Sequence, residues 1–122
     1  MKGLVSCFVS ALVVTAAVPA SAQGIKECGE PPVVQPSIPS GSALTAQKIR
    51  EARDTVVAYS QSVDVYLQCM DDRFSLLATY MTEDQRTQYN NDLASLHDGR
   101  RELQLKMNEA IRAFRAQASA GR

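Results

Sequence analysis

Side chains that perform chemistry in proteins are scarce in this chain, which has 122 residues, one histidine and three cysteines. As a general base, His97 would need a nucleophile or another partner held close to it. The adjacent Asp98 would point elsewhere on a helix, because side chains share a helix face only three or four positions apart. We therefore expect His97 to lie partly exposed on a helix face.

A metal site is the alternative role for His97. It would need the histidine to cluster with soft thioether ligands, and the spacing of the residues does not force such a cluster. The methionines concerned are Met70, Met81 and Met107. A small ligand- or metal-binding periplasmic protein that uses these residues is the second functional hypothesis. The first hypothesis has no metal and no cofactor.

The charged residues predict no catalytic pair. Asp71 and Asp72 are neighbours that diverge around a helix, so we expect a solvated face and not two paired carboxylates. Arg100 and Arg101 could bind an anion. We favour a different interpretation, in which Arg101 faces water and Arg100 reaches from an apolar seam to a carboxylate such as Asp64. The sequence therefore predicts a protein that is not an enzyme.

Three tyrosines, Tyr59, Tyr66 and Tyr80, fall on one stripe of a predicted helix. Such a stripe could be an aromatic binding surface. More often it forms a core or a helix-packing interface, because large aromatic rings contribute most when buried. We expect the packing role.

Composition excludes two classes of protein. Hydrophobic residues make up 45% of the chain and the formal net charge is zero. This balance is too apolar for a disordered chain, and it lacks the basic face of a nucleic-acid binder. The length allows one small domain. We expect no nucleic-acid partner.

Residues 1–22 have the pattern of a cleavable signal peptide. Lys2 supplies the positive start, and residues 3–18 carry no charge. Ala20-Ser21-Ala22 then provides the small side chains that signal peptidase requires. We expect cleavage between Ala22 and Gln23, and hence a periplasmic or secreted protein.

Two other interpretations of this segment are weaker. A lipoprotein-type box that ends at Cys7 lies too early, with almost no apolar run before it. An uncleaved anchor would need a longer apolar run. Downstream of Gln23 no apolar run is long enough to span a bilayer, so we expect no stable membrane insertion after cleavage.

Cleavage would remove Cys7 and leave one cysteine pair, Cys28 and Cys69. In an oxidising compartment the expected state of such a pair is a disulfide within the chain. The alternatives are an intermolecular bridge and a redox pair. The redox role is disfavoured because no Cys-x-x-Cys motif is present.

Residues 23–42 predict an extended arm. The segment holds four prolines, which fix φ, lack an N–H and push the preceding residue into extended geometry. They are Pro31, Pro32, Pro36 and Pro39. At about 3.1 Å per residue, the arm is just long enough to run back along the following helix to Cys69. Val33, Val34 and Ile38 would then cover the edge of the helix seam.

Residues 43–118 predict two helices, at about 43–81 and 83–118. Thr82 to Gln85 is a capping-box sequence that starts the second helix, and Ser42 is an acceptable N-cap for the first. Apolar residues recur at helical spacing on both helices, and this phase continues across Asp98-Gly99. We therefore expect a continuous second helix there, in preference to two helices. Residues 119–122 predict a disordered tail.

Each helix carries its own apolar stripe. On the first the stripe is interrupted by Arg73 and comprises Ile49, Ala52, Val56, Tyr59, Val63, Tyr66, Met70, Leu77 and Tyr80, with Leu67, Phe74 and Met81 beside it. On the second it comprises Tyr89, Leu93, Leu96, Leu103, Met107, Ala110, Ile111 and Phe114. The predicted fold is all-α: an antiparallel, coiled-coil-like two-helix hairpin with an extended Pro-rich arm held by Cys28–Cys69. A homodimer that forms a four-helix bundle is one hypothesis for its partner.

The segment Ile38-Pro39-Ser40-Gly41, together with Cys28 and Tyr66-Leu67-Gln68-Cys69-Met70, resembles a group of small exported proteins of proteobacterial type. Members of that group have an N-terminal Cys/Pro-rich arm, a Tyr-x-x-Cys helix and no assigned activity. The resemblance implies a helical, exported architecture and supplies no catalytic residue. The first functional hypothesis is therefore a non-enzymatic module of the cell envelope that acts in structure or in protein interaction.

Overall fold

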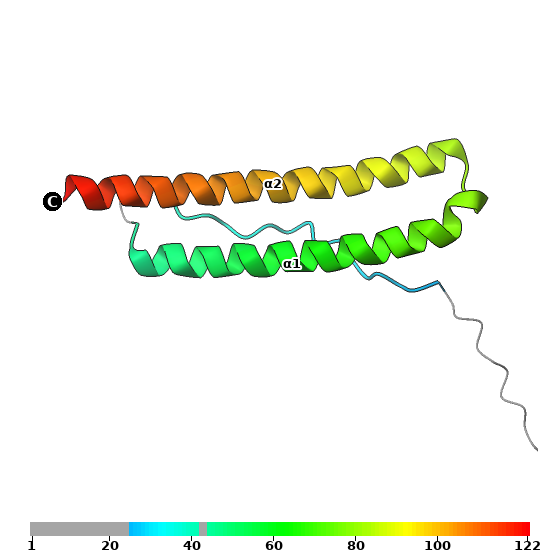
Figure 1. Cartoon of the computed structure of the whole chain (residues 1–122), viewed down its shortest axis with the longest axis horizontal. Helices are drawn as coiled ribbons and strands as arrows, with labels where there is room; N and C mark the ends of the chain where they lie inside the picture. The colour runs from blue at the N-terminus through cyan, green and yellow to red at the C-terminus, as the bar shows by residue number, and fades with distance from the viewer. Residues whose placement is uncertain (1–24, 42–43) are drawn as a thin grey trace, which may run out of the picture.

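Two long helices dominate the computed structural model, which describes residues 25–41 and 44–122. Helix α1 spans Ala46–Leu77 and helix α2 spans Glu83–Ala120, with the 3-10 turn η1, Ala78–Tyr80, between them. The helices lie side by side and antiparallel (Figure 1). No strand occurs in the described ranges. The prediction of an all-helical protein with one disulfide is confirmed.

Several sequence predictions concern residues outside the described ranges. They are the signal peptide, its cleavage between Ala22 and Gln23, the lipoprotein box at Cys7, and the N-cap at Ser42. Among the described residues, neither helix combines the length and apolar character needed to cross a membrane.

Helix α1 is shorter than predicted at both ends. It begins at Ala46, three residues later than expected, because the Thr45 side chain accepts a hydrogen bond from the backbone N–H of Lys48 and so caps the helix. It ends at Leu77, after which the turn η1 leads to an extended Met81. The chain reverses direction between the two helices. The turn η1 ends α1, and the extended residues Met81 and Thr82 then lead into α2, whose N-cap is Thr82.

Helix α2 starts as predicted and ends later. The Thr82 hydroxyl accepts from the Gln85 backbone N–H at 3.2 Å, and the Gln85 side chain accepts from the Thr82 N–H at 2.9 Å. The helix passes through Asp98-Gly99 without a break, in agreement with the apolar phase. It continues to Ala120, so Ser119 and Ala120, which were predicted to lie in a disordered tail, are helical.

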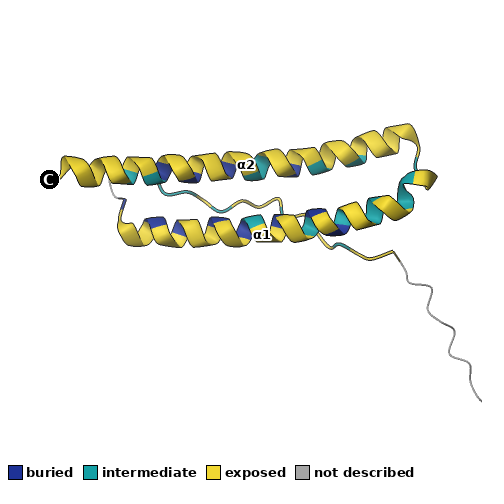
Figure 2. Ribbon diagram, viewed as in Figure 1, coloured by how far each residue is buried: buried dark blue, intermediate teal, exposed yellow. Residues whose placement is uncertain are grey.

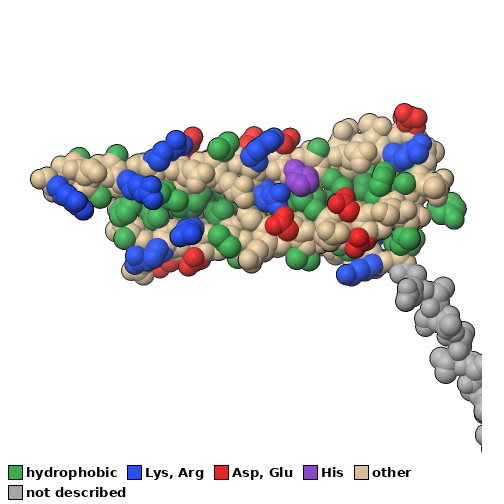
Figure 3. Space-filling model, in the orientation of Figure 1, with side chains coloured by type: hydrophobic (Ala, Val, Ile, Leu, Met, Phe, Trp, Pro, Cys, Tyr) green, Lys and Arg blue, Asp and Glu red, His purple; other side chains and the backbone are tan. Residues whose placement is uncertain are grey.

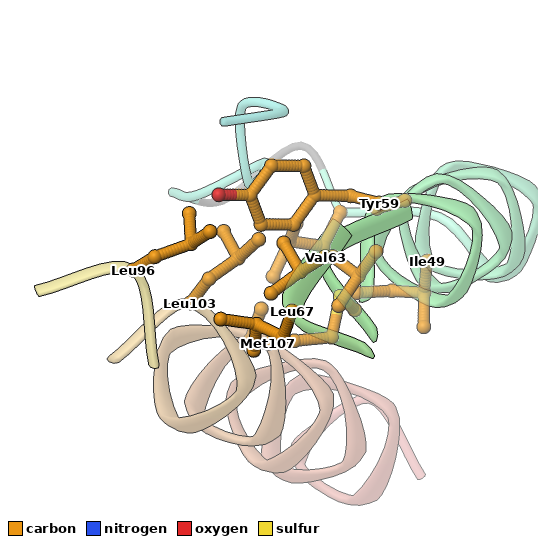
Figure 4. Packing of buried hydrophobic residues seen from close by; sticks show 11 residues of the cluster. Ile49, Tyr59, Val63, Leu67, Leu96, Leu103 and Met107 are labelled. Atoms are coloured by element: carbon orange, nitrogen blue, oxygen red, sulfur yellow. The ribbon is translucent and has the colours of Figure 1, made fainter. Parts of the chain in front are cut away.

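The core is the seam between the two helices (Figures 2 and 4). Val63 and Leu103 are the most deeply buried side chains in it. Their neighbours in the cluster are Leu44, Ile49, Ala52, Val56, Tyr59, Leu67, Leu96, Met107 and Ala110. The predicted stripes account for nearly all of these residues. Tyr80 is the main departure, because it lies in the turn and is 85% exposed.

The arm, residues 25–41, begins on the side of α1 away from α2, passes α1 and then runs along the helix pair in the direction of α2 (Figure 1). One end is held by the Cys28–Cys69 disulfide, whose Cα atoms are 5.7 Å apart. At the other end the Gln117 side chain donates to the Gly41 carbonyl at 2.9 Å. Ile38 packs against the core between these two points. The arm is therefore a third layer that covers part of the helix seam.

Two valines of the arm do not have their predicted role. Val33 is 68% exposed and Val34 is 86% exposed, although both were expected to cover the seam. A tight turn, in which the Val33 N–H donates to the Pro31 carbonyl at 2.9 Å, redirects the chain here. Both side chains therefore remain largely in solvent, and only Ile38 covers the seam.

Candidate functional site

A groove lies beside the arm, between α1 and α2, and we call it the tyrosine groove. It comprises two adjoining hollows of about 410 Å³ and 640 Å³. Four residues line both hollows, which makes the groove continuous: Tyr66, Met70, Tyr89 and Asp92. Arm residues line part of both hollows, and the second hollow extends from the arm at Cys28 and Gly29 to the turn at Tyr80 and Met81.

Helix α1 places Tyr59 and Tyr66 in the groove because they are seven positions, about two turns, apart. Tyr59 is buried, and its hydroxyl donates to the Pro32 carbonyl of the arm at 2.9 Å. Figure 4 shows this hydroxyl directed away from the core, toward the arm. Tyr66 is half-buried, and its hydroxyl has no hydrogen-bond partner among the described residues. One tyrosine of the predicted stripe, Tyr59, is therefore packed and hydrogen-bonded, whereas the hydroxyl of Tyr66 is not hydrogen-bonded within the described residues.

Helix α2 contributes Tyr89, whose position is tightly set. Its hydroxyl donates to the Met70 carbonyl at 2.6 Å, and its ring packs against Phe74 with centroids 5.1 Å apart. Burial raises the pKa of Tyr89, and the nearby Arg73 charge opposes that rise. The phenol therefore stays a neutral donor at physiological pH. The ring forms a fixed part of the groove wall.

Polar side chains follow the rims of the groove. Gln85, Gln88 and Asp92 stand on the α2 side of the second hollow, and Arg73 stands on the α1 side. Amide, carboxylate and guanidinium groups on opposite rims can hydrogen-bond to a ligand whose apolar parts contact the floor. The arrangement suits binding, because it offers apolar contact and directional bonds together.

Gly99 leaves room for the arm to lie close to α2. The residue is helical, and a Cβ atom there would lie 2.8 Å from Nε2 of Gln35 on the arm. The absent side chain lets the extended arm lie close to the helix backbone. The sequence showed the helical phase at this glycine but gave no sign of the contact, since Gln35 is distant along the chain.

The predicted ion pair of Arg100 is present. Its guanidinium donates to the Asp64 carboxylate across the helices, and the Arg100 side chain is 20% exposed. Arg101 is largely exposed and pairs within its own helix with Asp98 at 2.5 Å. The interpretation of Arg100 as a seam residue that reaches a carboxylate is therefore confirmed. Asp71 and Asp72 are exposed, as expected.

The residues of the metal hypothesis lie apart. His97 is exposed beside the charged side chains seen in Figure 3, with its Nδ1 3.3 Å from the Arg100 guanidinium. Met107 is in the core, ten positions, or about 15 Å, further along α2. Met70 and Met81 line the tyrosine groove instead. Residues 25–41 and 44–122 contain no group of three His, Cys, Asp or Glu side chains able to hold a metal ion.

Sequence reasoning did not single out Tyr89, Phe74 or Asp92 as site residues. Tyr89 was placed on the apolar stripe of the second helix, and Phe74 was placed beside that of the first. Their meeting depends on how the antiparallel helices are aligned, which no local pattern specifies. The aromatic character of both residues was the one available signal.

No family model matches the chain, and searches of curated proteins and of solved structures find no match either. The geometry of the tyrosine groove therefore carries the functional argument.

Proposed function

We propose that this chain is an exported protein of the cell envelope that acts as a non-enzymatic interaction module. The observation that supports this most directly is the tyrosine groove, a continuous hollow between the two helices beside the arm. The groove has an apolar floor, a polar rim and an aromatic wall held by Tyr89. Tyrosine-rich surfaces of this kind are enriched in protein interfaces, because the rings bury much area with little loss of side-chain freedom.

Two observations support export. The first 22 residues have the charge, length and small-residue pattern of a signal peptide. The Cys28–Cys69 disulfide fits an oxidising compartment. Intact-mass analysis of protein purified from the periplasm should give a chain that begins at Gln23. A mass that includes residues 1–22, or an added lipid, would contradict this expectation.

The helix pair also supports a hypothesis of self-association. A coiled-coil-like hairpin exposes a second face on each helix, and each helix here has an exposed apolar side chain, Val57 at 47% and Leu105 at 54%. These side chains are scattered, whereas the tyrosine groove is a continuous hollow. We therefore favour a partner in the groove over a homodimer through the outer faces.

Site-specific photo-crosslinking tests the proposed function in cells. A benzophenone amino acid at position 66 would lie in the groove, and one at position 76 would replace Leu76, which is 60% exposed and lines neither hollow. We expect a discrete covalent adduct to a second protein from position 66 and none from position 76. Equal adducts at both positions, or none at either, would refute a groove-based interaction module.

A further inference from the structure

The first hollow of the tyrosine groove has the size of a small-molecule site. Its volume is about 410 Å³, within the range that is typical of ligand pockets. Three segments wall it, because the arm contributes Pro31, Val33 and Gln35 and the two helices contribute the rest. The disulfide holds the arm on α1, and the Tyr59 hydroxyl bonds to the Pro32 carbonyl. The wall is therefore in place before a ligand binds, which lowers the entropic cost of binding.

Aromatic side chains make up much of this wall. Tyr59, Tyr66 and Tyr89 line the hollow together with the thioether of Met70. Tyr89 is held by its hydrogen bond to the Met70 carbonyl and by its ring contact with Phe74. Aromatic rings attract cations because their faces carry negative charge, and the thioether sulfur is polarisable. Such a wall accepts an apolar body and favours a positive charge over a negative one.

Among the described residues, Asp92 is the one charged side chain that lines the first hollow. One of its carboxylate oxygens accepts a hydrogen bond from the Gln88 amide at 2.8 Å, and no lysine or arginine of the described chain forms an ion pair with it. It shares a face of α2 with Ser95 and Gly99, where this helix passes the arm. The carboxylate therefore lacks a counter-cation at the hollow, and an ammonium group is its chemical complement.

Three further polar side chains line the hollow and have no hydrogen-bond partner within residues 25–41 and 44–122. They are Gln35, Tyr66 and Ser95. Their hydroxyl and amide oxygens accept hydrogen bonds, so each can bind an ammonium N–H. An anion would also meet donors here, but it would lie near the Asp92 carboxylate with no basic side chain in the described lining to offset the repulsion. This set of groups therefore selects a cation.

The surrounding half of the molecule carries charge of the same sign as Asp92. Residues 25–35 and 66–95 contain seven acidic and three basic side chains, whereas the other described residues contain six acidic and nine basic ones. On the face seen in Figure 3, most lysine and arginine side chains lie toward the C-terminal end of α2. Arg73, the basic residue of the groove, lines only the second hollow. The negative potential around the first hollow therefore raises the local concentration of small cations.

We infer that the first hollow of the tyrosine groove binds a small organic cation, in which an ammonium group is joined to an apolar or aromatic body. The ammonium group pairs with the Asp92 carboxylate, and the body contacts the rings of Tyr66 and Tyr89. The volume of the hollow suits a free small molecule as the source of this cation. The inference goes beyond the proposed interaction function, which concerns a protein partner on the groove.

Phenethylamine is the probe, because it joins one aromatic ring to an amine that is protonated at neutral pH. Two control ligands keep the ring and change the charge: phenethyl alcohol is neutral, and phenylacetate is an anion. Each is titrated at neutral pH into the purified, disulfide-bonded, isotope-labelled protein, and amide chemical shifts are followed by nuclear magnetic resonance. We expect saturable shifts at Tyr66, Asp92 and Ser95 with a dissociation constant of about 1 mM or below for the cation. Both controls should bind at least about tenfold more weakly.

Variants of the protein test the carboxylate and the aromatic wall. Asp92→Asn keeps the size of the side chain and an oxygen for the Gln88 bond but removes the charge, so it should weaken binding of the cation about tenfold or more and leave that of the alcohol unchanged. Asp84→Asn is the matched control, because Asp84 is exposed in the same acidic part of the chain and lines neither hollow. It should change the affinity by less than about twofold. Tyr66→Ala should weaken binding of the cation about threefold to tenfold. Circular dichroism melts verify that each variant is folded.

Several results would overturn the inference. They are the absence of saturable shifts with phenethylamine, equal affinity for either control ligand, and an unchanged affinity in Asp92→Asn. An equal loss in Asp84→Asn would also overturn it, because the overall charge alone would then attract the probe. An adduct from position 66 in cells without binding of the cation would refute this inference and leave the interaction function standing. Saturable binding of the cation without such an adduct would support this inference and refute the interaction function.

Discussion

Removal of the Cys28–Cys69 disulfide should detach the arm from the helices and lower the stability of the whole chain. The bridge joins residues 41 positions apart. Closing a loop of that length restricts the unfolded chain by about 4 kcal/mol at room temperature in the loop-entropy description. Domains of this size are stable by roughly 5–15 kcal/mol, so the loss would be a large fraction of the total.

The contacts of the arm then weaken as a consequence. Without its covalent end, the arm keeps the Tyr59 hydroxyl bond to Pro32, worth about 1 kcal/mol, and the partly buried Ile38. These contacts must offset the ordering entropy of the segment, which is about 1–2 kcal/mol for each residue's backbone. We therefore expect the freed arm to leave the seam for much of the time.

The assay compares the double variant Cys28→Ser/Cys69→Ser with the disulfide-bonded chain. Urea unfolding followed by circular dichroism should show a free energy of unfolding lower by about 3–4 kcal/mol. Backbone chemical shifts of Gln35 and Ile38, measured by nuclear magnetic resonance, should move toward random-coil values. As a control, Gln117→Ala removes only the exposed hydrogen bond to the arm at Gly41 and should cost less than about 1 kcal/mol.

A loss smaller than about 1 kcal/mol in the double variant would refute this reasoning, because it would lie well below the loop-entropy value. Unchanged chemical shifts at Gln35 and Ile38 would also refute it. Either result would mean that the arm is held by its own contacts and that the disulfide adds little.

Three further predictions concern the helices. Gly99→Ala should raise the melting temperature slightly, because alanine stabilises a helix by up to about 1 kcal/mol relative to glycine and the Gln35 side chain that the new Cβ meets is flexible. The rise should be larger in a Gln35→Ala background. A lower melting temperature would contradict this prediction. Arg100→Leu should raise the free energy of unfolding by up to about 1 kcal/mol in urea titrations, because the added apolar burial outweighs an ion pair whose Asp64 side chain is 66% exposed. A lower free energy of unfolding would show that the ion pair stabilises the fold more than the added apolar burial does. The raised pKa of Tyr89 means that the folded chain retains a proton that the unfolded chain loses above about pH 10, so the free energy of unfolding should fall as pH rises through that range. Tyr89→Phe should make this fall with pH less steep. An equally steep fall in the variant would refute the role of Tyr89.

The local part of the fold was predictable because its signals are short-range. The capping box at Thr82 and Gln85 predicted the start of α2 to within the residue. The apolar phase across Gly99 predicted a continuous helix, because one glycine costs less than a change of register in the whole stripe. The start of α1 was wrong by three residues, since Thr45 also caps a helix and no local rule ranked it above Ser42.

The candidate site was predictable only in part. Tyr66 and Tyr80 were expected to share one packing role, but Tyr66 lines the groove and Tyr80 lies exposed in the turn. The difference arises because α1 ends at Leu77, which removes Tyr80 from the helical stripe. Val33 and Val34 were assigned to the seam because the length of the arm and the disulfide implied an extended path along the helix, and the turn at Pro31 places them in solvent instead.

The sequence by itself determined the helices, the extended arm and the pairing of Cys28 with Cys69, because periodicity, proline geometry and cysteine count act locally or by elimination. The tertiary structure alone decided which tyrosine hydroxyl is used and which is available. The Tyr59 hydroxyl meets the Pro32 carbonyl, whereas Tyr66, which lies on α1 between Tyr59 and the disulfide-bonded Cys69, has no hydrogen-bond partner among the described residues. Two tyrosines seven positions apart in one stripe have the same predicted environment on the helix. Only the path of the arm, which is distant along the chain, gives their hydroxyls different surroundings.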